Sequence, residues 1–380
     1  MLIKNGLVFN SETGRFDSKN IVIENGVITQ LGAITKYDGE ILDARRARII
    51  PGLVDVHTHG RAGFDFLSCS DKDLCTMASS YAKRGVTCVM PTLASASLED
   101  MLLAVDKINK FEASDDGAAF CGVHIEGRYL NPQKAGAHKR EYLSELRASE
   151  LEADVLRECR ALHITAALEL DADGSFLEKA LEIGATVALG HTNASYASAK
   201  LAEERGATAY THLFNTMPPL HHRDGGAVCA AFDGSAFAEL ICDGIHISPE
   251  MLSLAYRLLT SRRTVLISDS MEGAGCPDGE YSIAGNTVIM KDGRALTTEG
   301  ALAGSTLDLF AAMSNLCKLC GVPLSEAVLC ATANPCREVG VYDKYGSIDV
   351  GKSADMIILE IGSEPRIDKV ILRGKLIDVN

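Results

Sequence analysis

Short apolar runs alternate with amphipathic segments through the middle of the chain. Runs of this length suit buried strands, and the segments between them repeat apolar residues three and four positions apart, as helices do. Eight such runs can be placed: LVDVHTH, GVTCVMPT, AAFCGVHIE, LHITAALEL, ATVALGHT, ATAYTHLF, AELICDGIHI and TVLISDS. Strands that alternate with helices predict an α/β fold, and eight βα units favour a closed (β/α)8 TIM-type barrel over an open sheet.

The two ends of the chain follow a different pattern. The first fifty residues form short alternating runs, with Asn25-Gly26 as a hairpin turn between two of them. The last segment, from GSIDVGKSADMIILE to RGKLI, returns to short strands. We expect both ends to pair into one small discontinuous β-sandwich domain. The predicted division is residues 1–50 and 343–380 for this β domain and 51–342 for the barrel.

Composition and charge restrict the partners and the location of the protein. The formal net charge of −14 argues against nucleic acid and anionic membranes as partners. No apolar run approaches the roughly 18 residues of a membrane span, and the N-terminus lacks the pattern of a signal peptide. The 12 cysteines have no framework spacing, which favours a reducing compartment. We therefore expect a cytoplasmic protein.

Residues that bind metals or move protons stand at the ends of the predicted strands. His57 and His59 end the first strand, where alternation points both side chains to one side. Because the carboxyl ends of barrel strands form the active site, the other strand-end residues should converge on these two. They are Glu126, His191, His212, His246 and Asp269. Histidines with a bridging carboxylate can hold one or two divalent cations, and Asp269 can accept a proton from water. The pattern indicates metal-assisted hydrolysis.

The motifs at these positions also resemble a known family over nearly the whole chain. PGLVDVHTHG at the first strand and GSIDVGKSADMIIL near the end resemble the amidohydrolase superfamily. More narrowly, the motifs resemble those of the N-acetylglucosamine-6-phosphate deacetylases and occur in the same order. They are HIEGRYLNPQKAGAH, GHTNASY, THLFNTMPPLHHRDGG, DGIHIS, SDSMEGAG and GALAGST. The resemblance implies hydrolysis of the acetamide of N-acetyl-D-glucosamine 6-phosphate to D-glucosamine 6-phosphate and acetate, in amino-sugar catabolism or recycling.

The resemblance implies roles for individual residues. Glu126, His191 and His212 match the family's metal ligands. Asp269 matches the catalytic proton donor and acceptor, and with His57 and His59 it completes the expected metal-binding set. The matching substrate contacts are Ala137, His138, Asn215, Thr216, Arg223, Asp243, His246, Leu302, Ala303 and Gly304. In similar enzymes the arginine of the HHRDGG-type loop reaches the phosphate of a neighbouring subunit, so a homodimer is implied.

Two positions bear on how far the resemblance applies. Some family members lack the two histidines after the first strand and use one metal, whereas His57 and His59 favour two metals bridged by Glu126. Family members usually carry proline where this chain has Arg128, which would add a cation beside the metal carboxylate. The native metal stays open between zinc and iron, because the same ligands suit both.

Three alternatives to this activity stay open. An N-acetylgalactosamine-6-phosphate deacetylase differs only in the epimer of its substrate. A cyclic-amide hydrolase of the same superfamily typically bridges its metals with a carbamylated lysine, and the fourth strand, LHITAALEL, offers none. A non-catalytic amidohydrolase-like scaffold is expected to have lost metal ligands that this chain retains.

Overall fold

A parallel barrel forms the body of the molecule in the computed structural model, which describes residues 1–34 and 36–379. Its strands follow one another around the barrel in chain order. The first strand, β6, pairs with β9 and also contacts the last strand, β16, which closes the barrel. The strands are β6 (Leu53–Thr58), β9 (Val86–Leu93), β11 (Val123–Glu126), β12 (Leu162–Ala166), β13 (Thr186–Leu189), β14 (Ala209–Tyr210), β15 (Phe237–Ile241) and β16 (Thr264–Ile267). The short β10 (Ala119–Phe120) pairs with β9 just before β11. The predicted barrel is confirmed.

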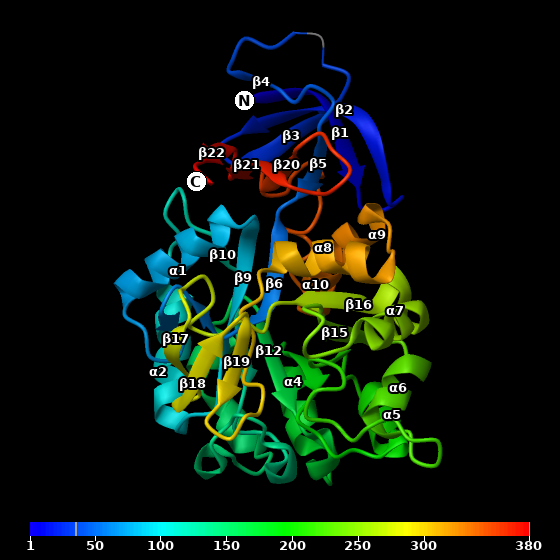
Figure 1. Ribbon diagram of the computed structural model, residues 1–380. Coiled ribbons are helices and arrows are strands. Elements are labelled where there is room, and N and C mark those ends of the chain that lie inside the picture. Colours follow the sequence, from blue (N-terminus) through cyan, green and yellow to red (C-terminus); the bar gives the residue numbers. More distant parts are fainter. Residues whose placement is uncertain (35, 380) are drawn as a thin grey trace.

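Helices connect these strands and cover the outside of the barrel (Figure 1). Several begin at a serine whose side chain accepts a backbone N–H of the first turn, as at Ser70, Ser97, Ser195 and Ser248. The helices are α1 (Asp71–Lys83), α2 (Leu98–Lys110), α3 (Asp154–Arg157), α4 (Ser175–Glu182), α5 (Tyr196–Glu204), α6 (Gly226–Asp233), α7 (Pro249–Arg263), α8 (Leu309–Cys320), α9 (Leu324–Ala331) and α10 (Ala333–Glu338). None of the helices in the described residues has the length and apolar character needed to cross a membrane.

Alternation along the strands separates an apolar outer face from a polar inner face. On β12, Leu162, Ile164 and Ala166 pack into the main core with the helices. His163 and Thr165 lie between them in sequence, so they point to the opposite face, into the barrel. All these side chains are buried. Polar groups inside the barrel therefore need partners there, because they are shielded from bulk solvent.

The two ends of the chain form one sheet at one end of the barrel (Figure 1). In this sheet β5 lies antiparallel to β20, with Ile50 opposite Ile357, and the sheet has an apolar cluster of its own. Its strands are β1 (Leu2–Asn10), β2 (Arg15–Glu24), β3 (Val27–Gly32), β4 (Ile41–Asp43), β5 (Arg48–Pro51), β20 (Met356–Leu359), β21 (Ile367–Leu372) and β22 (Lys375–Ile377). The predicted discontinuous β domain is present, and its boundaries at residues 50 and 343 stay a prediction.

A three-stranded antiparallel sheet follows the last barrel strand. It consists of β17 (Gly279–Ile283), β18 (Asn286–Lys291) and β19 (Arg294–Thr297), and it packs against Met271 and Ala303. Asn286 Nδ2 donates to the carbonyl of Ala137 at 2.6 Å. The sheet therefore joins the loop after β11 to the loop after β16. A small hairpin of β7 (Gly60–Arg61) and β8 (Phe64–Asp65) follows β6.

Candidate active site

The carboxylate of Glu126 lies between two pairs of histidines at the carboxyl end of the barrel strands. Its Oε2 lies 3.2 Å from His57 Nε2 and 2.9 Å from His59 Nε2. Its Oε1 lies 3.3 Å from His191 Nε2 and 2.9 Å from His212 Nε2. Residues that end or follow β6, β11, β13 and β14 thus meet, although up to 155 positions separate them (212 − 57 = 155). The convergence expected from the strand ends is present for these five residues.

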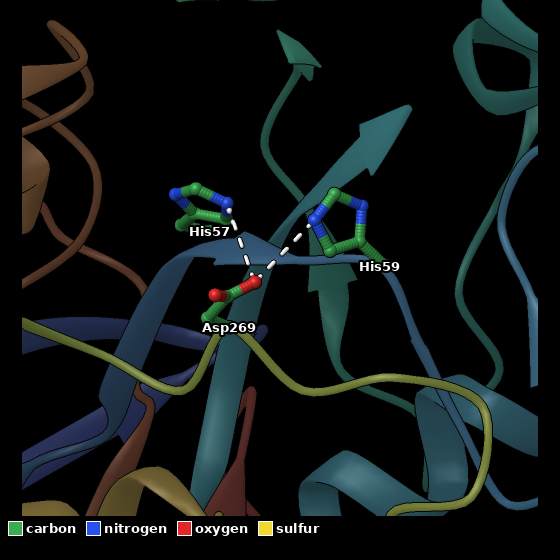
Figure 2. A group of neighbouring side chains, drawn as sticks. All are labelled: His57, His59 and Asp269. Carbon is green, nitrogen blue, oxygen red and sulfur yellow. Dashed lines mark ion pairs between the residues drawn. The ribbon is translucent and has the colours of Figure 1, made fainter. Parts of the chain in front are cut away.

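Asp269, which follows β16, lies beside His57 and His59 (Figure 2). Its Oδ1 lies 3.6 Å from His57 Nε2 and 3.4 Å from His59 Nε2. Asp269, His191 and His212 all have positive φ angles, of 47°, 46° and 29°. Residues with side chains rarely adopt this conformation, and such strain concentrates at functional sites. The backbone is thus bent to direct these side chains into the centre.

Hydrogen bonds fix the ring orientation of two of these histidines. His57 Nδ1 lies 2.9 Å from Glu239 Oε2, and His191 Nδ1 lies 2.8 Å from the carbonyl of Lys134. A carboxylate and a carbonyl can only accept, so Nδ1 carries the hydrogen in both rings. In the neutral rings, Nε2 then directs a lone pair towards Glu126. This orientation is common for histidines that bind a metal.

The arrangement of the potential ligand atoms fits a divalent metal. His191 Nε2 and His212 Nε2 lie 3.1 Å apart and both face Glu126 Oε1, so three potential ligand atoms converge there. His57 Nε2 and Glu126 Oε1 are buried and have no hydrogen-bond partner among the described residues. The potential ligand atoms form two groups, each with its atoms within 4.8 Å of one another. The groups are His57, His59 and Asp269, and Glu126, His191 and His212.

The protonation of the site also favours a bound cation. Burial lowers the pKa of His191 to about 4, so its ring has the neutral form that binds metals. Burial lowers the pKa of His59 as well, but Asp269 and Glu126 raise it further, to about 9. Burial raises the pKa of Glu126, but the charge of His57 and the neighbouring histidines hold it well below its usual range. The two carboxylates thus attract positive charge, which a divalent cation can supply in place of a proton.

The loop after β11 brings His138 to the edge of the centre. His138 Nε2 lies 3.7 Å from Glu126 Oε2. The backbone N–H of Ser95 donates to His138 Nδ1 at 3.2 Å, so the hydrogen of the neutral ring lies on Nε2. His138 therefore presents a hydrogen-bond donor to the site. Ala137, beside it, is held by the hydrogen bond from Asn286.

Two further predicted substrate segments lie on ordered loops. After β15, Asp243 Oδ1 accepts the backbone N–H groups of Ile245 and His246, both at 2.8 Å, and its Oδ2 lies 2.6 Å from His246 Nδ1. The segment Leu302–Gly304 runs beside Asp269, because the N–H of Ser305 donates to the carbonyl of Asp269 at 2.7 Å.

The loop after β14 divides into a part near the centre and an exposed part. Asn215 Nδ2 donates to the carbonyl of His212 at 3.2 Å. Thr216 packs against Gly136, where a Cβ would lie 2.9 Å from Thr216 Cγ2 and 3.1 Å from His191 Cε1. Arg223 is exposed, and its Nη1 lies 2.7 Å from His222 Nε2 in its own loop. The hydrogen bonds of Arg223 do not connect it to Glu126.

The structure corrects the expectation that Arg128 adds a positive charge beside the metal carboxylate. Arg128 has a φ of 61°, and its guanidinium forms two hydrogen bonds with Glu150, at 3.0 Å each. A third bond reaches the carbonyl of Ala96 at 3.1 Å. The charge is thus neutralised by Glu150, and Arg128 ties together the loop after β11.

Glu239 orients His57, and Ser95 orients His138. The sequence patterns predicted neither of these two supporting residues. Glu239 stands alone among apolar residues in AELIC, and a charge inside a buried strand requires a partner. That signal indicates an interaction but cannot identify His57 as the partner. Ser95 gives no comparable signal, because serine is common in loops.

Comparison with known proteins agrees with this geometry. The model of the amidohydrolase family matches residues 48–377. An N-acetylglucosamine-6-phosphate deacetylase from Vibrio furnissii is 34% identical over 97% of this chain and 93% of its own length. An N-acetylgalactosamine-6-phosphate deacetylase from Escherichia coli O157:H7 is also 34% identical, over 96% of each chain.

Solved structures extend the similarity to the whole fold. N-acetylglucosamine-6-phosphate deacetylase from Thermotoga maritima has a TM-score of 0.85 at 30% identity and covers 99% of both chains. The Mycobacterium smegmatis enzyme, solved as a mutant in complex with N-acetyl-D-glucosamine-6-phosphate, has a TM-score of 0.88 at 26% identity and covers 99% of this chain and 98% of its own. The chain therefore belongs to the amidohydrolase family and, within it, to the branch that contains the N-acetylglucosamine-6-phosphate deacetylases.

Proposed function

We propose that this protein hydrolyses the acetamide of N-acetyl-D-glucosamine 6-phosphate and releases D-glucosamine 6-phosphate and acetate. The observation that carries the proposal is the position of Glu126 between two histidine pairs, with Asp269 beside one of them. The relatives that share this fold over nearly their whole length support the choice of substrate class. The N-acetylgalactosamine epimer is the second candidate, because a relative named for it is equally identical.

Two cations would share the carboxylate of Glu126 in this proposal. Glu126, His191 and His212 would hold one, and His57, His59 and Asp269 would hold the other. A bound zinc or iron ion polarises a carbonyl oxygen and lowers the pKa of a water molecule. The ligand set of imidazoles and carboxylates suits either element.

Asp269 moves the proton in this proposal. Its carboxylate accepts a proton from the attacking water and returns it to the leaving amine nitrogen. Burial raises the pKa of Asp269, but its hydrogen bond with His59 and the charge of His57 lower it further, so the residue begins as a carboxylate. It is 7% exposed, which leaves little water to compete for the proton.

Two histidines would bind the substrate as hydrogen-bond donors. Burial lowers the pKa of His246, but Asp243 raises it above its usual value and so favours the imidazolium. Its Nε2–H can then donate to the acetyl oxygen, where negative charge develops. His138 would donate through Nε2 to the sugar.

Arg223, with Asn215 and Thr216, would bind the phosphate, since a guanidinium pairs well with phosphate oxygens. Its exposure suits a contact across a homodimer, in which each subunit would complete the other's site. The 12 free cysteines support a reducing cytoplasm as the location.

Acetate release tests the function. The 6-phosphates of N-acetylglucosamine and N-acetylgalactosamine are assayed beside the unphosphorylated sugars, with metal analysis of the same sample. We expect the first phosphate to give the highest kcat/KM. Preference for the galactosamine epimer would favour the second candidate, and no release from any of the four would contradict both. Arg223→Ala should raise the KM for the phosphorylated sugar, whereas Leu220→Ala, at an exposed position of the same loop, should not.

A further inference from the structure

A second group of buried titratable residues lies inside the barrel, apart from the ligands of the proposed active site. His163 is on β12, Glu239 is on β15 and Glu338 ends α10. One potential ligand atom from each lies within 4.8 Å of those from the other two. His163 and Glu239 are 0% exposed and Glu338 is 1% exposed. We call these three residues the barrel cluster.

Each member of the barrel cluster has polar atoms without a partner. His163 Nε2, Glu239 Oε1 and both carboxyl oxygens of Glu338 have no hydrogen-bond partner among the described residues. The other oxygen of Glu239 is used, because it faces His57 Nδ1 at 2.9 Å and accepts the N–H of His212 at 3.0 Å. Leaving several buried polar atoms unpaired is costly, so an additional bound group is expected here.

The tautomer of His163 shows what kind of group fits. The Thr186 hydroxyl donates to the carbonyl of Leu162 at 3.4 Å, and His163 Nδ1 lies 2.7 Å from the same hydroxyl oxygen. When the Thr186 hydroxyl donates to this carbonyl, its oxygen accepts the Nδ1–H of His163, and Nε2 then has a lone pair. In this tautomer, His163 Nε2 and the carboxylate oxygens of Glu239 and Glu338 are all acceptors, so one cation can satisfy them together.

The charges of the barrel cluster are likewise unbalanced. No lysine or arginine of the described chain forms an ion pair with Glu239 or Glu338, and Glu239 pairs with His57 instead. Burial and the charge of Glu239 hold the pKa of Glu338 well above its usual range, as expected of a buried carboxylate without a cation beside it.

We propose that the barrel cluster binds a single divalent cation through His163 Nε2, Glu239 and Glu338. An imidazole with two carboxylates suits zinc, iron or manganese. Three ligands at about 2.0–2.2 Å from one ion lie about 3.4 Å apart at tetrahedral angles, so the side chains would draw together around it from their present separations of up to 4.8 Å. Since Glu239 also orients His57, this ion would hold that carboxylate in place beneath the active site.

The burial of the barrel cluster distinguishes this ion from those of the active site. Because its ligands are at most 1% exposed, the ion would enter during folding and resist chelators in the folded protein. The active site opens to substrate, so its metals should be removed more easily. Metal retention after chelation therefore reports on the barrel cluster without any measurement of activity.

The experiment compares the purified wild-type protein with Glu338→Gln after prolonged dialysis against dipicolinate. Mass spectrometry of the metals should find about one equivalent retained in the wild type and none in the variant. Reloading with zinc should restore the same number of chelator-labile equivalents in both, because Glu338 is not a proposed ligand of the active site. A wild type that retains no metal, or equal retention by both proteins, would overturn the proposal.

Anomalous diffraction from wild-type crystals needs no variant and covers the case in which Glu338→Gln does not fold. A peak between His163, Glu239 and Glu338 supports the cation. Anomalous peaks only at the active-site centre around Glu126, with a water molecule in the barrel cluster, would overturn the proposal. Neither readout depends on acetate release, so failure of this proposal and failure of the proposed function are distinguishable.

Discussion

Glu239 Oε2 lies 2.9 Å from His57 Nδ1, so a buried carboxylate fixes the ring of a proposed metal ligand. Such partners typically change metal affinity by about 10–100-fold when they are replaced. We expect Glu239→Gln to weaken binding of the metal held by His57 and His59 by that factor, because the amide removes the negative charge. Competition with a chelator measures the affinity.

The matched control for this prediction is Glu203→Gln, in which a partly buried carboxylate that accepts the Tyr210 hydroxyl loses its charge. Glu203 contacts no proposed ligand, so its replacement should leave metal affinity unchanged. Equal affinities in all three proteins would show that Glu239 does not act through His57.

The number of bound metals depends on the histidines that end the first barrel strand. Replacement of His57 and His59 by asparagine should remove one chelator-labile metal equivalent and leave the one at Glu126, His191 and His212. Metal analysis checks the count. Replacement of the exposed His221 and His222 by asparagine should leave the metal count unchanged. An unchanged count in the His57 and His59 variant would show that these two residues are not ligands.

Arg128 holds a backbone conformation that proline cannot adopt. Its φ is 61°, whereas proline fixes φ near about −65°. Arg128→Pro would also lose the N–H that donates to Ser95 Oγ at 3.3 Å. We expect a destabilisation of about 1–3 kcal/mol beyond that of Arg128→Gly, which loses the ion pair with Glu150 but tolerates the angle. Urea unfolding of both variants measures the difference, and equal midpoints would contradict this account.

The barrel and the convergence at Glu126 were predictable because they follow from local patterns. Each strand is a short apolar run, and parallel strands in a barrel bring their carboxyl ends together whatever lies between them in sequence. The positions of His57, His191 and Asp269 at strand ends were enough to place them near one another.

The residues that support the site were not predictable in the same way. Glu239 lies 182 positions from His57, and no pattern in the sequence connects the two. Arg128 was expected to lie beside the metal carboxylate because it follows Glu126 closely in sequence. The sequence does not show its positive φ angle, which accompanies a side chain turned towards Glu150. Such contacts depend on how distant elements pack.

The pair of Asp243 and His246 should make stability depend on pH. Burial lowers the pKa of His246, but Asp243 raises it above the usual value near 6.5. A raised pKa means that the pair's stabilisation is complete below about pH 6.5 and is lost as pH rises through the folded-state value. The pKa of Asp243 is lowered despite burial, chiefly by His246, so on the acid side the stabilisation is lost as pH falls below about 3.8.

Melting temperatures of the wild type and Asp243→Asn across pH 4–9 test this dependence. The difference between the two proteins should be largest between about pH 4 and 6.5 and should shrink at higher pH. In a His246→Gln background, Asp243→Asn should change the melting temperature less at every pH, since the charged partner of Asp243 is gone. A difference that stays constant across the range would exclude a charge interaction between these residues.

Asp269 provides the most direct test of the chemistry, because asparagine keeps its size and one oxygen but cannot accept a proton. Asp269 Oδ1 lies 3.4 Å from His59 Nε2, and the backbone N–H of Asp269 donates to the carbonyl of His57, so Asp269→Asn should keep its place in the site. We expect turnover per metal-loaded protein to fall by about 10²–10⁴-fold, the usual contribution of a general acid and base. The KM for N-acetyl-D-glucosamine 6-phosphate should change little, since the residue is assigned to proton transfer and not to the sugar or phosphate. Near-normal turnover with full metal content would assign the proton transfer to another group, and His246, whose pKa the charge of Asp269 helps to raise, would be the next residue to replace.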